Sequence, residues 1–430
     1  MHQEHVSWPN IAASIDDRIP GKEAILKADR QLNIVGAEFK ANPFPLLARL
    51  RESEPVFRTH LPDKTKTPVW LLTRYADVFA LLKDDRFVKN RRSALTAEQV
   101  RRLPWVPPMF RPLERNMLDL DQPDHTRLRA LVHKAFTPRL VEQMQERVQT
   151  LADELLERVA HRHEMDLIND YALPLPMTII TEILGVPTSD RHKFHKWSKA
   201  VVSLSSPNAT VRVIPSVWMF IRYLRRFFKV RRADPKGDLA SALIRAEEAG
   251  DKLSEDELLA MVFLLLIAGH ETTVNLIGSG AFALLEHPDQ MERLRREPGI
   301  IKPVIEELLR YTSPVFMTTE RYAREDVTIH DVTIPRGEMT LGVIGSANRD
   351  EKVFRNPDSL DITREPNKHL SFGQGIHFCL GAPLARLEAQ IAINTLLRRM
   401  PDLRLKVSPD SLRWRPSMIL RGLDALPIEF

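Results

Sequence analysis

The sequence predicts a mainly α-helical protein with small β-sheets, an α+β chain in which helices supply most of the core. The longest expected helix, residues 254–285, begins with the capping-box pair Ser254 and Glu257 and meets no helix-breaking proline before Pro288. The strand-like segments, such as residues 69–73, are short and alternate in polarity over only a few positions. Long helices and short strands together indicate this fold class.

Composition indicates a soluble globular protein. Of its 430 residues, 43% are hydrophobic and 28% are charged, and no Gly/Ser linker, internal repeat or low-complexity tract divides the chain. Residues 1–40 are weakly patterned, so we expect them to form a poorly ordered N-terminal extension. We expect residues 41–430 to form a single domain.

Charge and cysteine content exclude several classes of protein. The net charge of +5, from 62 basic and 57 acidic residues, is small for this length and does not indicate a nucleic-acid partner. Cys379 is the only cysteine, so no disulfide can form within the chain, and residues 1–30 lack the apolar core of a signal peptide. The longest apolar run, residues 258–269, is shorter than the roughly 20 residues of a membrane span. We therefore expect a cytoplasmic protein with no membrane span.

The remaining elements follow from hydrophobic spacing, because helical intervals predict helices, alternation predicts strands and clustered prolines predict loops. Before the long helix we expect a helix over 44–50, strands over 55–57 and 69–73, a helix over 75–82, an irregular loop over 103–112, a helix over 124–136, helices across 139–200 with a break near 173–176 and an extended piece at 166–170, and a helix over 211–232. After it we expect a helix over 303–314, a small antiparallel sheet from 327–329, 332–338 and 339–345, an aperiodic stretch over 354–370, a helix over 382–399, and a hairpin over 413–428 turning near Gly422.

The helix expected over residues 211–232 has two interpretations. It combines large aromatic side chains with a run of basic residues, namely Arg222, Arg225, Arg226, Lys229, Arg231 and Arg232. A basic amphipathic helix can lie on a membrane or on a partner. Alternatively, the segment is a mobile helical lid whose basic face is solvated.

Residues 372–381, which read Phe-Gly-Gln-Gly-Ile-His-Phe-Cys-Leu-Gly, surround the only cysteine. Glycines at positions 373, 375 and 381 would let the backbone adopt positive φ and approach a flat group closely. A lone thiolate in such a loop suits a soft metal. The alternative is that Cys379 is a small buried apolar residue beside a turn.

The long helix contains the motif Ala268-Gly-His-Glu-Thr. Thr272 lies four residues after Ala268, so its hydroxyl can bond to that carbonyl and locally widen the helix. Gly269 would leave room for a small ligand. A carboxylate such as Glu271 is costly in an apolar helix unless it is paired or used. The motif therefore favours a functional site, although threonine can also satisfy its hydroxyl on its own helix.

Taken together, these residues resemble the soluble bacterial cytochrome P-450 family. The resemblance covers roughly residues 41–430, and the matching motifs occur in the family's order. They are the helix Ala268-Gly-His-Glu-Thr, the helical pair Glu307 and Arg310, and the loop that contains Phe372, Gly373, Gly375, His377, Cys379 and Gly381. The resemblance implies the family's fold, in which haem lies between a long distal helix and a proximal cysteine loop.

The resemblance also implies a role for each matching residue. Cys379 looks like the thiolate ligand of the haem iron, and Glu271 and Thr272 look like the acid–alcohol pair that delivers protons to bound dioxygen. Glu307, Arg310 and Arg364 resemble a buried triad that braces the segment before the cysteine loop. The haem-binding residues implied are His125, Arg129, Ala268, Gly269, Arg321, Phe372, Gly373, His377, Cys379 and Gly381, among which His125, Arg129, Arg321 and His377 match positions that hold the propionates.

The implied activity is that of a haem-thiolate monooxygenase containing heme b (iron protoporphyrin IX), which uses O2 and electrons to hydroxylate or epoxidise an apolar small molecule. The candidate substrates are a fatty acid, a terpenoid, a steroid or a macrolide-like compound. Its pocket would be lined by residues 103–110, 201–228, 263–264, 268, 314–319 and 418–420, with Thr318 and Thr319 able to add a hydrogen bond.

Because no flavin or iron–sulfur motif is visible, electrons would come from a separate ferredoxin or flavodoxin with an NAD(P)H reductase. This partner would dock on the cysteine side through basic residues such as Arg127, Lys134 and Arg139. Two alternatives stay open. A peroxide-driven peroxygenase would lack the Glu271-Thr272 pair, and a non-catalytic haem-bearing ligand sensor would not need it.

Overall fold

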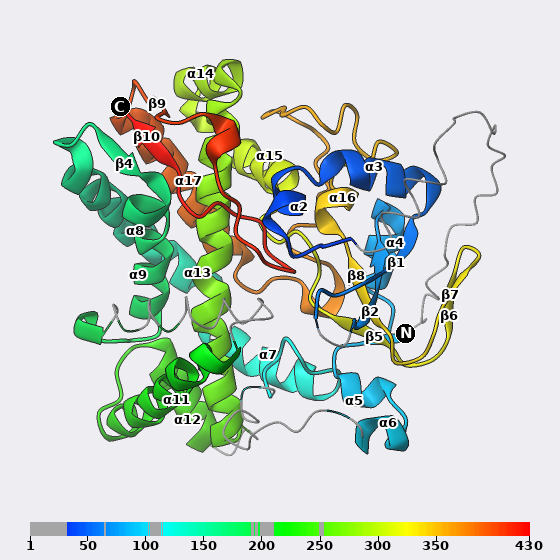
Figure 1. Ribbon diagram of the computed structural model, residues 1–430. Helices are drawn as coiled ribbons and strands as arrows, with labels where there is room; N and C mark the ends of the chain where they lie inside the picture. Colours follow the sequence, from blue (N-terminus) through cyan, green and yellow to red (C-terminus); the bar gives the residue numbers. More distant parts are fainter. Residues whose placement is uncertain are drawn as a thin grey trace, which may run out of the picture.

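The computed structural model describes residues 32–63, 66–101, 103, 113, 115–190, 193, 197, 210–248 and 253–430. One long helix, α13 (Glu255–Leu285), runs through the molecule, with several of the longer helices on one side and a mixed β-sheet, accompanied by shorter helices, on the other (Figure 1). The architecture is therefore mainly helical with small sheets, as the sequence predicts. Most of the expected loop over residues 103–112 and most of 191–209 lie outside the described residues.

The helices that the sequence predicts occur in the expected order, and several others that it does not predict are added to them. They are α2 (Ala37–Ala41), α3 (Phe44–Ser53), α4 (Tyr75–Leu81), α5 (Arg91–Ala94), α6 (Ala97–Arg101), α7 (Asp124–Ala135), α8 (Pro138–Ala160), a π-helix (Leu167–Ala172), α9 (Pro174–Ile183), α11 (Thr210–Ala233), α12 (Leu239–Glu248), α13, α14 (Pro288–Arg296), α15 (Ile301–Thr312), α16 (Ile344–Ala347) and α17 (Ala382–Arg399). Short 3-10 turns span Thr188–Asp190, Pro298–Ile300, Gly375–His377 and Pro409–Ser411.

Three sheets accompany the helices. The largest has the strand order β1 (Val56–His60), β2 (Pro68–Leu72), β8 (Met339–Gly342), β5 (Arg321–Ala323) and β3 (Phe87–Val88). In it β2 and β8 are parallel, and the other pairs are antiparallel. A second sheet pairs β10 (Pro427–Glu429) with β4 (Glu164–Asp166) and β9 (Arg404–Leu405), and a third is the hairpin of β6 (Val327–Ile329) and β7 (Val332–Ile334).

The start of α13 confirms the predicted capping box. The Ser254 hydroxyl accepts a hydrogen bond from the Glu257 amide at 3.2 Å, and the Glu257 carboxylate accepts one from the Ser254 amide at 2.8 Å. Although α13 is long and apolar enough to cross a membrane, most of its apolar window is buried against other parts of the protein, among them α9, α15 and α17. It is therefore a core helix, as expected for its apolar run.

Four expectations about local structure need correction. Residues 167–172 form a π-helix rather than an extended piece, because the Asp166 carboxylate accepts the amide of Ile168 and starts a helical turn. Strand β8 leaves the small antiparallel sheet and joins the largest sheet instead, beside β2.

The other two corrections concern the ends of the chain. The terminal hairpin is reduced to a single bridge between Trp414 and Leu423, and Gly422 lies on its returning strand. A side chain at Gly422 would collide with Asn275 of α13, so packing explains that glycine. Residues 32–40 do not fit a poorly ordered extension, since Ile34 and Lys40 are fully buried. Residues 1–31 lie outside the described part of the chain.

Candidate active site

The loop that carries Cys379 is held by its own backbone. The Cys379 amide donates to the carbonyl of Phe372 at 2.9 Å, and Gly373 and Gly375 adopt φ of 70° and 69°. A side chain at Gly375 would also come within 2.9 Å of the Leu82 carbonyl oxygen. These two glycines therefore have the positive φ that the sequence predicts. The third does not, because Gly381 has φ of −80° and is the N-cap of α17.

The Cys379 thiol lies where a thiolate would be supported. Burial raises the pKa of Cys379, whereas hydrogen bonds from the backbone amides of Gly381 and Ala382 and the positive charge of Arg129 act in the opposite direction. Arg129 also donates to the Phe378 carbonyl at 2.7 Å, which ties α7 to the loop. The start of α17 thus points two amide donors at the sulfur, and a bound metal would displace the thiol proton.

The middle of α13 exposes one short stretch in an otherwise buried helix. Ala268 is exposed and Thr272 is partly exposed, while His270 and Glu271 are buried. The Thr272 hydroxyl donates to the Ala268 carbonyl at 3.1 Å, which confirms the predicted bond. The helix remains α-helical throughout, so the expected widening is not present. The exposed side of this turn can therefore border a ligand.

Gly269 has a different explanation from the one expected. A side chain there would come within 3.0 Å of Ile180 on α9, so the space beside this glycine is filled by protein. Close packing of α9 on α13 accounts for Gly269, and Ala268 is the exposed residue of the pair.

Glu271 has a partner that sequence reasoning missed. Its Oε2 lies 3.2 Å from Nη1 of Arg415, which comes from the C-terminal segment, and its Oε1 lies 3.6 Å from Nε2 of His270. Glu271 is only 6% exposed, so the cation offsets the cost of burying its charge. No local pattern links positions 144 residues apart, and only the tertiary fold reveals this pair.

A cluster of cations lies beside the cysteine loop. Of the four predicted propionate ligands, His125 and His377 have ring centroids 4.2 Å apart. Burial, together with the charges of Arg321, His125, Lys89 and Arg129, lowers the pKa of His377 to about 2. Burial, followed by the charge of Arg321, lowers the pKa of Lys89 to about 8. The structure therefore brings together all four predicted residues and adds Lys89, which the sequence analysis missed.

The same cluster has buried polar atoms that lack a partner. Within the described residues, Nδ1 of His125 and Nε of Arg321 make no hydrogen bond. Burial lowers the pKa of Arg321 to about 10, against the pull of Asp121 and Asp84. The clustered cations and the buried nitrogens without a hydrogen-bond partner fit an anionic ligand with more than one carboxylate. Such a ligand would balance the positive charge and would give these nitrogens a hydrogen-bond partner.

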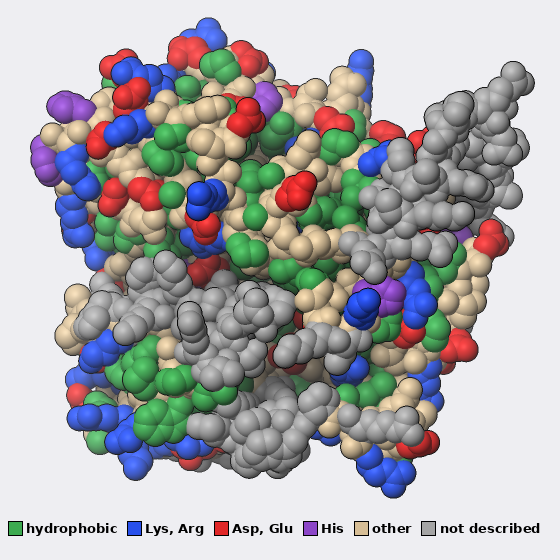
Figure 2. Space-filling model, viewed as in Figure 1, with side chains coloured by type: hydrophobic (Ala, Val, Ile, Leu, Met, Phe, Trp, Pro, Cys, Tyr) green, Lys and Arg blue, Asp and Glu red, His purple; other side chains and the backbone are tan. Residues whose placement is uncertain are grey.

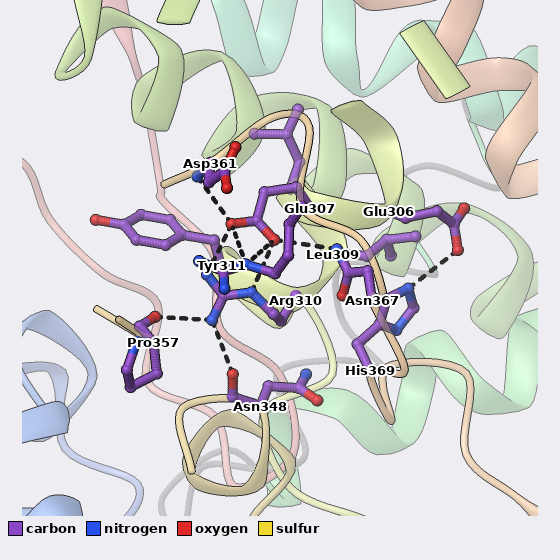
Figure 3. Close-up of polar contacts among 12 residues, drawn as sticks. Glu306, Glu307, Leu309, Arg310, Tyr311, Asn348, Pro357, Asp361, Asn367 and His369 are labelled. Carbon is purple, nitrogen blue, oxygen red and sulfur yellow. Dashed lines mark hydrogen bonds and ion pairs between the residues drawn. The ribbon is translucent and has the colours of Figure 1, made fainter. Parts of the chain in front are cut away.

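The predicted bracing triad is centred on Glu307 and Arg310, whose contacts Figure 3 shows. Both side chains of the Glu307–Arg310 pair are fully buried, and two guanidinium nitrogens each donate to Glu307 at 2.8 Å. Arg364 Nε lies 3.1 Å from Glu307 Oε1. Arg310 also donates to the carbonyls of Asn348 and Pro357, at 2.9 and 2.7 Å. These contacts fix the aperiodic segment that leads into the cysteine loop.

The site residues fit haem. Cys379 can supply one thiolate ligand to the iron of a macrocycle. Within the described residues no group of three or more His, Cys, Asp or Glu side chains could hold a metal. The cationic cluster suits the propionates of such a macrocycle, and the exposed Ala268 leaves part of the distal helix open. A surface depression of about 590 Å³ adjoins the cluster and is lined by His125, Thr126, Arg129, Ala130, His133, Lys134, Gly375 and Ile376.

A helical fold, a glycine-flanked thiolate and an acid–alcohol turn on the central helix define a haem-thiolate oxygenase. Comparisons with known proteins agree. The family model "Cytochrome P450" matches residues 229–414. The polyketide biosynthesis cytochrome P450 PksS of Bacillus subtilis (strain 168) is 47% identical over 394 residues, which cover 91% of this chain and 97% of that protein.

Two solved structures extend the match. A myxobacterial cytochrome P450, CYP267B1, in complex with myristic acid, is 42% identical, with a TM-score of 0.86 over 92% of this chain and 98% of that one. P450BioI, in complex with an acyl carrier protein that carries hexadec-9Z-enoic acid, is 40% identical, with a TM-score of 0.82 over 92% and 100%. The chain therefore belongs to the cytochrome P450 family, and it is a monooxygenase of the bacterial type that uses haem, O2 and separate redox proteins.

Proposed function

We propose that this protein is a heme b monooxygenase that hydroxylates or epoxidises a long aliphatic substrate, either a fatty acyl chain or a polyketide-derived chain. The observation that carries the proposal is the apolar character of the expected pocket segments. On α13, Phe263 and Leu264 are partly exposed beside the exposed Ala268, and Val315 forms a bridge with Leu420. Such surfaces favour a substrate with few polar groups.

The polar side chains in these segments already have protein partners. The Thr318 hydroxyl accepts the amide of Gly342 at 3.0 Å, and the Thr319 hydroxyl accepts a hydrogen bond from Lys89. Each of these hydroxyls keeps its own hydrogen, so either threonine could still donate the substrate hydrogen bond that the sequence suggests. The relatives support the proposed substrate class, since PksS is a polyketide biosynthesis enzyme and the two solved structures contain myristic acid and carrier-bound hexadec-9Z-enoic acid.

Different residues of this chain would bind the cofactor, transfer protons and orient the substrate. The cofactor, when bound, supplies the oxygen-activating chemistry. Cys379 would hold the iron, and the cationic cluster with His125 and Arg321 would orient the macrocycle. Thr272 and Glu271 would hold and pass protons on the distal side. The apolar segments would keep water out and orient the chain.

A library titration tests the substrate class. Fatty acids, fatty acyl thioesters, macrolides, terpenoids and steroids are titrated while the spin-state band of the haem is followed, and products are identified by mass spectrometry with a ferredoxin and its NAD(P)H reductase. We expect spin shifts and oxygenated products with fatty acids of about 14 to 16 carbons, the range that the relatives suggest. Selective binding of steroids or terpenoids would contradict the proposal.

The thiolate assignment has its own test. The reduced carbon monoxide adduct should show the red-shifted Soret band of thiolate ligation, and Cys379→Ala should lose it. Retention of the band in the variant would remove Cys379 from the site.

Electrons would reach the haem from a ferredoxin or flavodoxin that docks on the cysteine side. Two apolar residues of the loop, Ile376 and Phe378, are 40% and 39% exposed. Lys134 on α7 and Arg139 on α8, which are close to each other in sequence, are also exposed. Arg127 is less suitable than the sequence suggests, because it pairs with Glu257 and Asp124. Turnover that is insensitive to salt and to Arg139→Glu would contradict this docking surface. A cytoplasmic location fits this electron supply and is part of the proposal.

A further inference from the structure

The outer side of α11 is the most unusual surface of the described residues. Seven large hydrophobic side chains are exposed there and elsewhere, and four of them lie on this one helix: Ile214, Trp218, Met219 and Val230, at 40%, 44%, 39% and 52% exposure. Contiguous exposed apolar groups of this kind mark interaction sites more often than ordinary surface. Hydrophobic side chains with basic ones around them are visible over α11 in the lower left of Figure 2.

Cations continue this surface toward the C-terminal end of α11. The helix contains no acidic residue, and four of its basic residues, Arg222, Arg225, Arg226 and Lys229, are exposed and form no ion pair with any described residue. The next two basic residues differ, since Arg231 pairs with Asp238 at 2.9 Å and Arg232 pairs with Glu247. The nearby acids thus neutralise the inward cations and leave the outward ones to solvent.

Five of the exposed residues of α11 lie along one stripe of the helix. At about 100° per residue, positions 214, 218, 222, 225 and 229 fall within an arc of roughly 80° and span about 22 Å. We call the stripe with its neighbours 219 and 226 the α11 face. It is distinct from the apolar side that packs inward, where Phe220, Leu224 and Phe228 are buried. Burial of the core therefore does not account for the exposed Trp218 and Ile214.

The inner side of α11 reaches the candidate active site. The rings of Phe220 and Phe263 have centroids 5.1 Å apart, and Phe263 lies on α13 five residues before the exposed Ala268. A molecule bound on the α11 face would therefore be one helix thickness from the residues that line the expected pocket.

We propose that the α11 face is the docking surface for an acidic acyl carrier protein that presents the substrate as a tethered chain. Charge complementarity supports an acidic partner, because four unpaired cations would be neutralised on binding. The apolar end with Trp218 supplies the buried contact that specific interfaces need. A relative that is 40% identical is seen with a fatty acid ligated to an acyl carrier protein. The inference rests on the proposed oxidation of an acyl chain and specifies how that chain arrives.

The distribution of side chains favours a folded partner over a membrane. A helix that lies on a bilayer has an apolar side along its whole length, flanked by cations. On α11 the exposed apolar residues Ile214, Trp218 and Met219 gather at one end and Arg225 and Lys229 lie toward the other, where the exposed Val230 is an exception. An apolar contact beside a patch of negative charge on a compact protein matches that division.

The test compares one acyl chain in two forms. Free palmitic acid and palmitoyl-loaded bacterial acyl carrier protein are each titrated against the haem-loaded enzyme, and turnover is measured with the same ferredoxin and reductase. Arg225 and Lys229 are exposed on the outer side of α11, so their side chains do not belong to the inward part of the expected pocket lining over 201–228. In Arg225→Glu/Lys229→Glu we expect the half-saturating concentration of the loaded carrier to rise on the order of 10-fold or more, with free palmitic acid unchanged. Trp218→Ala should act in the same direction, and in spin-state titrations without ferredoxin added salt should weaken binding of the loaded carrier but not of free palmitic acid.

The matched control reverses two other exposed cations, Arg49→Glu/Lys302→Glu, which lie on α3 and α15 and form no ion pair among the described residues. This control should bind the carrier as the parent does. Equal responses of the test and control variants would overturn the docking surface. A test variant that no longer binds anionic phosphatidylglycerol vesicles but still reacts normally with the loaded carrier would also overturn it. If the parent oxidises neither form of palmitate, the proposed function itself fails.

Discussion

Arg415 lies 3.2 Å from Glu271 and 3.4 Å from Asp424, so one guanidinium joins a carboxylate on the central helix to a carboxylate near the surface. The Glu271 side chain is 8% exposed, that of Arg415 is 25% exposed and that of Asp424 is 55% exposed. The three charges therefore form a graded path from the buried α13 turn to solvent. This relationship makes Arg415 a positioning residue for the acid of the acid–alcohol pair.

Replacing Arg415 by Gln should slow oxygenation. Without its cationic partner the buried Glu271 carboxylate is disfavoured as a charged group, and a positioned acid–base group contributes a factor of about 100 or more to proton transfer. We expect kcat to fall about 10-fold and the solvent isotope effect on kcat to increase, with Arg415→Lys restoring most of the rate. Asp424→Asn is the control, because it leaves the contact with Glu271 in place. An unchanged isotope effect in Arg415→Gln would assign the pair a purely structural role.

Removing the Thr272 hydroxyl should uncouple electron use from product. The hydroxyl lies on the exposed turn of α13, where it donates to Ala268 at 3.1 Å, so Thr272→Ala should change the proton supply with little effect on the helix. We expect NAD(P)H consumption to continue while the yield of oxygenated product falls severalfold and hydrogen peroxide accumulates. Thr272→Ser keeps a hydroxyl and should stay coupled. Full coupling in Thr272→Ala would show that the assigned role is wrong.

Glu307→Gln should destabilise the protein far more than the same change at the adjacent residue Glu306. Glu307 and Arg310 are fully buried, so loss of the carboxylate charge leaves an uncompensated cation, at a cost of about 3–5 kcal/mol. Glu306 is 28% exposed and pairs with both Arg386 and His369, which lower its pKa to about 2 against the effect of burial. Glu306→Gln should therefore also destabilise the protein, but much less than Glu307→Gln, because solvent screens its partly exposed charge. Urea unfolding midpoints and haem content measure both variants. Similar midpoints would contradict a bracing role for Glu307.

Local signals predicted much of this structure. The bounds of α13 and α17 agree with the expected helices because a capping box, helical spacing and a following proline all act within a few residues of the chain. The positive φ of Gly373 and Gly375 follows from the clustering of glycines around Cys379. The Glu307–Arg310 pair lies three apart on one helix, so sequence alone places its two members together.

The sequence could not predict contacts between residues that are far apart in the chain. Lys89 joins the cation cluster because β3, which ends at Val88, pairs with β5, where Arg321 begins the strand. Alternating polarity identified β8 as a strand but carried no information about its parallel partner β2. Gly269 was expected to make room for a ligand, whereas its neighbour is Ile180 from another helix. In each case the deciding atom lies far away in sequence.

A buried lysine near the N-terminal end of the described chain also escaped prediction. Lys40 is fully buried, and its ammonium donates to the Met418 carbonyl at 3.2 Å and lies 4.7 Å from the ring centroid of Phe316. Burial, and then the charge of Arg421, lower the pKa of Lys40 to about 7. Its only described anchors are a carbonyl and aromatic rings, so the charged form is poorly compensated.

This lysine should make stability rise with pH relative to a variant that lacks it. Between a folded pKa of about 7 and the unfolded value of 10.5, the unfolded chain binds more protons than the folded one, so raising the pH favours the folded state. The free energy of unfolding of the parent minus that of Lys40→Met should be flat below pH 7. It should then increase by up to about 1.4 kcal/mol per pH unit between pH 7.5 and 9.5. Urea titrations at five pH values measure it, and groups common to both proteins cancel in the difference. A difference that stays constant across this window would mean that Lys40 remains protonated in the folded protein.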